Sequence, residues 1–102
     1  MPTSLTEHEF SQHLNTSFRV KLDSPPPLEL KLVEVKGYPG TPNERSGMER
    51  FSVFFTGPPD RRLPQHLYQL AHDLMGNFDI FLVPIAGDEK GFRYEAVFNY
   101  FK

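Results

Sequence analysis

Hydrophobic and polar residues alternate along most of the chain with a period of two, which is typical of β-strands buried on one face. The first clear stretch places Phe18, Val20 and Leu22 on one side, with Arg19 and Lys21 between them. Segments with this pattern, or with an apolar run of strand length, are residues 17–22, 28–36, 50–56, 67–72, 78–85 and 94–100. The pattern therefore predicts about six strands.

The second of these strands contains a change of phase. Leu28, Leu30 and Leu32 share one face, but Val33 follows Leu32 directly and Val35 continues the new phase. A one-residue slip of this kind predicts a β-bulge, which bends a strand around a corner.

The segment between Pro64 and Pro84 is less regular. Residues 67–72 also fit helical spacing, but the short distance from Pro64 to Gly76 favours a strand. Gly76 predicts a tight turn, and the nearly continuous apolar run 78–85 predicts a central strand covered on both faces and ended by Pro84.

The remaining segments are connections. Residues 25–27 are three prolines, residues 37–47 are rich in glycine, proline and charge, and residues 87–91 have the composition of a hairpin loop. We expect residues 37–47 to form an exposed, mobile loop.

The N-terminal segment predicts one short helix. Thr6 is a suitable N-cap with Glu9 three residues later, and Asn15 is a plausible left-handed stop. Phe10 and Leu14 share a helical face and are expected to pack onto the core. Because the turns leave no room for crossover helices, residues 1–102 are interpreted as one mainly β domain of about six antiparallel strands in a small barrel or strongly bent sheet.

Composition narrows the range of functions. The 102 residues include 10 Phe and 10 Pro but no cysteine, which excludes disulfides and thiolate metal sites. The net charge is −2 and the densest basic cluster is Arg61-Arg62, which argues against nucleic-acid binding. The longest apolar runs are far below the roughly 20 residues of a membrane helix, and no secretory signal is evident, so we predict a soluble cytoplasmic protein without a membrane partner.

Candidate catalytic and metal-binding patterns are weak. His8 and His13 are five residues apart and would diverge by about 140° around a helix, so they cannot share one ion. His66 and His72 have no third ligand near them in sequence, and no serine has the glycines of a nucleophile elbow. We therefore predict a non-enzymatic protein with no metal and no cofactor.

The surplus of aromatic residues is the most informative feature. Four phenylalanines fall on the phase opposite to the main apolar face of their strands: Phe54, Phe81, Phe92 and Phe101. Such a face is covered either by the N-terminal helix or by a protein partner, including a second copy of the chain. The alternative function is a small-ligand-binding barrel, in which the loop at 37–47 closes over a mouth lined by Arg50, Tyr68, His72 and Tyr94.

Several segments in one order carry a family resemblance. They are the strand and turn at 51–58, Leu63-Pro-Gln65, Tyr68-Gln-Leu70, Phe81-Leu-Val-Pro-Ile85 and Tyr94-Glu-Ala-Val-Phe-Asn99. Together they resemble a family of small bacterial proteins of unknown function. His66 stands where the related pattern often has glycine. The resemblance implies an accessory or structural role, in some members beside phage-tail-collar-like proteins, and it implies no catalytic residues.

Overall fold

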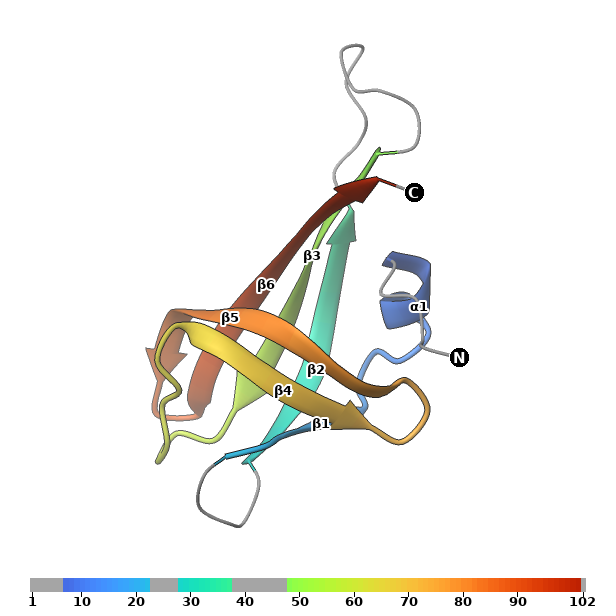
Figure 1. The fold of residues 1–102 in the computed structure, drawn as a ribbon. Helices are drawn as coiled ribbons and strands as arrows, with labels where there is room; N and C mark the ends of the chain where they lie inside the picture. Colours follow the sequence, from blue (N-terminus) through green and yellow to red (C-terminus); the bar gives the residue numbers. More distant parts are fainter. Residues whose placement is uncertain (1–6, 23–27, 38–47, 102) are drawn as a thin grey trace.

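Six antiparallel strands form a closed barrel in the order β1-β2-β3-β6-β5-β4, with one short helix at the N-terminus (Figure 1). This computed structural model describes residues 7–22, 28–37 and 48–101, with backbone alone at 48–50 and 99–101. The elements are α1 Glu7–Ser11, β1 Ser17–Val20, β2 Leu28–Gly37, β3 Met48–Gly57, β4 His66–His72, β5 Gly76–Asp88 and β6 Gly91–Phe101. The predicted fold class is confirmed.

Within the barrel, β2, β3 and β6 form one long sheet, and β1, β4 and β5 cross in front of it (Figure 1). β3 and β6 pair along their whole length. β5 pairs with β6 only from Asp88↔Gly91 to Val83↔Glu95, and the two strands then separate. Closure between β1 and β4 uses two residue pairs, Arg19↔Ala71 and Val20↔Leu70.

The predicted bulge in β2 is confirmed. The register against β3 passes from Leu32↔Phe55 to Glu34↔Phe54, so Val33 is the extra residue. The bulge lets a strand that starts beside β1 continue beyond the barrel as part of the long sheet.

Two expectations for β5 are wrong. Pro84 does not end the strand, which runs on to Asp88 with an irregularity between Pro84 and Ala86, where the missing N–H of proline is tolerated. β5 is also not covered on both faces, since Phe81 and Ile85 are 48% and 44% exposed. The turn before it lies at residues 73–75, and Gly76, with φ 82°, is the first residue of the strand.

The core fills the barrel and extends under α1. Phe10 is fully buried, whereas Leu14 is 39% exposed, so the helix contributes one anchor and not the two that were expected. The reason is that α1 ends at Ser11 and leaves Leu14 in the following turn. Asn15 adopts the predicted left-handed conformation, with φ 68°. Thr6, residues 25–27 and the loop at 38–47 lie outside the described residues.

Candidate interaction surface

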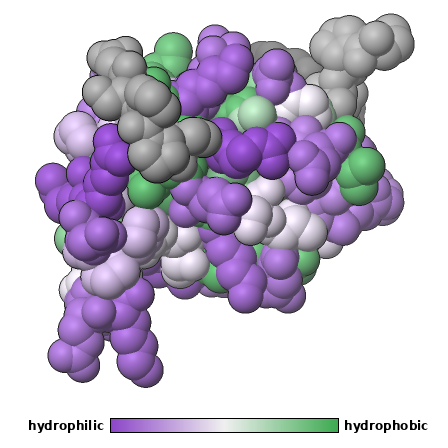
Figure 2. Space-filling view, turned by 90° about the horizontal axis from the view of Figure 1, so that it is seen from below, coloured by the Kyte–Doolittle hydropathy of each residue, from purple (hydrophilic) through white to green (hydrophobic). Residues whose placement is uncertain are grey.

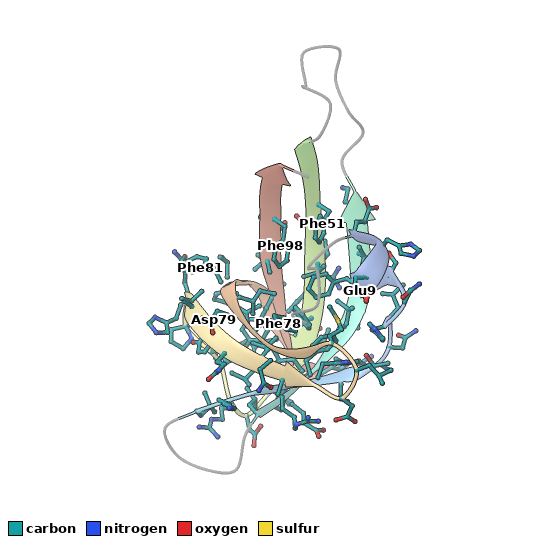
Figure 3. All side chains as sticks on the ribbon, turned by 45° about the vertical axis from the view of Figure 1, so that its right-hand side comes forward. Glu9, Phe51, Phe78, Asp79, Phe81 and Phe98 are labelled. Carbon is teal, nitrogen blue, oxygen red and sulfur yellow. The ribbon has the colours of Figure 1, made fainter. Side chains whose placement is uncertain are left out.

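The space where β5 leaves β6 is filled from inside by aromatic rings. Phe10 of α1 lies 5.4 Å from Phe98, 6.0 Å from Phe51 and 6.0 Å from Phe78, measured between ring centroids. Figure 3 labels three of these rings, Phe51 and Phe98 on the long sheet and Phe78 on β5. The helix therefore covers an inner aromatic cluster, formed by Phe10, Phe18, Phe51, Phe78 and Phe98, and not the outward-facing phenylalanines.

The outward-facing phenylalanines have different surroundings. Phe54 is half-buried beneath the guanidinium of Arg93, 4.8 Å from its ring centroid, and Arg93 also pairs with Glu34 at 2.6 Å. The ring of Phe92 lies over Gly87, where a Cβ would come within 2.5 Å of the ring. Phe54 and Phe92 are thus largely satisfied within the chain.

Among the members of the predicted surface whose side chains the structure describes, Phe81 is the one that remains open. Its ring lies directly across from Leu67 of β4, which is 54% exposed. Val83 lies on the same face of β5, opposite Glu95, and Val97 of β6 is 64% exposed. The side chain of Phe101 lies outside the described residues.

Leu67, Phe81 and Val83 lie on the outer face of the paired strands β4 and β5. We call these three residues the outer patch. Val97 also faces outward, but it lies on β6 beyond the last pair with β5, Val83↔Glu95, where the two strands separate. The sequence did not predict Leu67 and Val97 as surface residues. Because side chains alternate along a strand, the buried neighbours Tyr68 and Ala96 require Leu67 and Val97 to face outward.

Of the four residues proposed for a ligand mouth, the three whose side chains the structure describes do not line one opening. The hydroxyl of Tyr94 is buried in the core and accepts the N–H of Leu63 at 2.9 Å. Tyr68 donates to the carbonyl of Pro64, and burial, followed by the nearby Tyr94, raises the pKa of Tyr68. Both tyrosines therefore anchor the β3–β4 connection. His72 lies at the far end of β4, and the side chain of Arg50 lies outside the described residues.

His72 closes the opposite end of the β4–β5 hairpin. Its Nδ1 accepts the N–H groups of Leu74 and Met75, both at 3.1 Å, so that nitrogen carries no proton. Nε2 then carries the proton and donates it to Oγ1 of Thr16 at 3.0 Å. The Thr16 hydroxyl in turn donates to the carbonyl of His13 at 2.6 Å. This network ties the segment after α1 to the hairpin.

Burial lowers the pKa of His72, and the neighbouring His13, with ring centroids 4.7 Å apart, lowers it further. The hydrogen bonds at Nδ1 act in the same direction because they require a neutral ring. Both nitrogens of this imidazole have a partner within the chain, so the histidine holds the hairpin and the segment after α1 together.

Surface hollows add little chemistry. A hollow of about 420 Å³ lies between the β5–β6 hairpin and the end of β3, with Thr56, Lys90 and Arg93 on its wall. Arg93 is held by Glu34, and Asp88 accepts the N–H groups of the hairpin turn. In the described part of the chain, histidine, aspartate and glutamate form no group of three or more that could hold a metal ion.

The end of the barrel seen from below is mostly hydrophilic, with hydrophobic residues in small separate areas (Figure 2). No helix among residues 7–22, 28–37 and 48–101 is long and apolar enough to cross a membrane.

A comparison with models of protein families gives a match over most of the chain. A family model described as "Domain of unknown function (DUF6916)" matches residues 5–98, a range that starts before α1 and ends within β6. No curated protein and no solved structure matches the chain. The match therefore covers the barrel and assigns no chemistry to it.

Proposed function

We propose, from the geometry of this member of a family of domains of unknown function, that the chain is a non-enzymatic protein-interaction or assembly domain. The observation that supports the proposal is the outer patch, in which Leu67 and Phe81 face each other across β4 and β5 and are both about half exposed. Exposed aromatic and aliphatic side chains on adjacent strands are typical of the centre of a protein interface.

The distribution of buried groups favours this role over the alternative of a ligand-binding barrel. Large side chains fill the barrel interior, among them Phe18, Phe55, Leu70, Leu82 and Tyr94. A barrel that holds a ligand leaves its interior open for it. As the setting we propose an accessory part of a bacterial phage-tail-like particle, which is supported by the sequence resemblance alone.

The experiment replaces Phe81 with glutamate, which puts a charge at the centre of the outer patch. The matched control is Leu74→Glu, because Leu74 is 77% exposed in the β4–β5 turn and outside the patch. Each change is at an exposed position and should alter the free energy of unfolding by about 1 kcal/mol or less.

Association is measured by sedimentation velocity over a range of concentrations and by co-purification of a stoichiometric partner. We expect the unmodified chain and the Leu74→Glu variant to associate and Phe81→Glu to lose association. A chain that stays monomeric and keeps no stoichiometric partner would contradict the proposal, whereas two variants that associate alike would show that association does not use the outer patch.

A further inference from the structure

The upper half of β6 is a sheet edge. Residues 96–101 pair with β3 on one side, but the described residues give them no strand on the other side, because pairing with β5 stops at Glu95. In Figure 1 this half of β6 forms the margin of the long sheet, away from α1. At about 3.3 Å per residue the edge is about 20 Å long, which is enough for a typical strand to pair with it.

The other margin of the long sheet is protected. Beyond its pairing with β1, β2 carries Glu34 and Lys36, and α1 packs against it. The segment after α1 also bonds to Leu32, whose carbonyl accepts the N–H of Asn15 at 2.6 Å and whose N–H donates to the carbonyl of Thr16 at 3.1 Å. Charge and coverage are the usual means by which proteins prevent edge pairing.

The edge of β6 has neither of these protections among the described residues. Its sequence, Ala-Val-Phe-Asn-Tyr-Phe, contains no charged residue and no proline, and four of its six residues are β-branched or aromatic. An uncharged edge of this length and composition is a favourable template for another strand.

We infer that a second copy of this chain pairs with β6 through the edge at Ala96–Phe101, in the antiparallel sense, about a two-fold axis perpendicular to the sheet. The inference rests on the proposed interaction function and names the partner. It joins two long sheets into one, in the order β2-β3-β6-β6-β3-β2.

Two features of the edge favour a second copy over an unrelated strand. When two copies pair through the edge of β6, no like charges lie opposite each other, because the stretch is uncharged. If two copies paired instead through the separated part of β5, the Asp79 carboxylates of the two copies would repel each other. The two-fold axis also keeps the faces matched, so the exposed Val97 of each copy lies on the same outer surface, and the aromatic face of each sheet continues into that of the other.

Backbone amide exchange tests edge pairing directly. We expect amides within residues 96–101 to become protected as the protein concentration rises, while the amides of the β4–β5 turn at 73–75 do not change. Pairing bonds the exposed N–H groups of the edge, whereas packing through side chains alone leaves them open to water.

Substitution and cross-linking at Val97 provide the second test. Val97→Lys places a charge on the edge and should weaken dimerisation about tenfold or more, whereas Val97→Thr keeps a β-branched side chain and should dimerise. Since the chain has no cysteine, Val97→Cys can be joined by a bifunctional maleimide only between copies, and Leu74→Cys is the matched control.

The outcomes separate this inference from the proposed function. Dimers that protect residues 96–101 and cross-link through position 97 support edge pairing. Association that leaves these amides unprotected and is abolished by Phe81→Glu overturns edge pairing and keeps the interaction function. A strict monomer that also binds no stoichiometric partner overturns both.

Discussion

Replacing His72 tests whether a neutral, buried histidine stabilises this barrel. The ring accepts two backbone N–H groups at Nδ1 and donates to Thr16 at Nε2. Protonation of Nδ1 removes both hydrogen bonds, because the backbone N–H groups of Leu74 and Met75 then face another N–H group and no acceptor. The folded state therefore favours the neutral ring, in line with the lowered pKa of His72.

The sign and size of the effect follow from this geometry. Because the folded pKa lies below the ordinary value of 6.5, the unfolded chain binds the proton first as the pH falls. The contribution of neutral His72 to the free energy of unfolding is fully present above about pH 6.5. It is lost as the pH falls through the folded pKa, by at most about 1.4 kcal/mol per pH unit. The two bonds at Nδ1 together account for about 1–3 kcal/mol.

The assay is urea unfolding between pH 5 and pH 8, comparing the unmodified chain with His72→Asn and His72→Leu. Asparagine keeps an acceptor near the position of Nδ1 but does not titrate, so His72→Asn should lose much of the pH dependence below 6.5. Leucine leaves the N–H groups of Leu74 and Met75 without an acceptor and should be less stable at every pH. The reasoning is refuted if His72→Asn loses stability toward pH 5 as steeply as the unmodified chain.

Two further substitutions test the anchors of the core. Phe10→Ala removes the ring that α1 places among four other aromatic rings and should cost about 3–5 kcal/mol, measured by urea unfolding; a loss below about 1 kcal/mol would show that α1 is not needed to close the barrel. Tyr94→Phe leaves the buried N–H of Leu63 without its acceptor and should cost about 1–3 kcal/mol, with faster proteolysis in the β3–β4 connection; unchanged proteolysis would contradict the anchoring role of the hydroxyl.

Local pattern was sufficient to predict the strands and the bulge. A period of two records which face of a strand is buried, and the adjacent Leu32 and Val33 record the point at which the pleat is interrupted. Asn15 could likewise be predicted as the left-handed residue after the helix, because that conformation depends on the residue itself.

The surface could be predicted only in part. Sequence nominated Phe54 and Phe81 alike, since both face outward on their strands. The structure separates them because Arg93 of β6, held by Glu34 of β2, lies over Phe54, whereas no such cation lies over Phe81 in the described part of the chain. Whether an outward ring is covered depends on side chains from distant strands, which periodicity does not record.

The chain by itself thus determined the class of fold, the N-terminal helix and, where apolar and polar residues alternate strictly, the buried side of a strand, because these follow from the order of residues along a few neighbouring positions. Only the tertiary structure decided that the buried Tyr94 holds the β3–β4 connection and that β6 extends beyond its pairing with β5. Both depend on how far each strand pairs with a neighbour that is remote in sequence. That extent leaves an open edge on β6, the feature on which the self-pairing proposal depends.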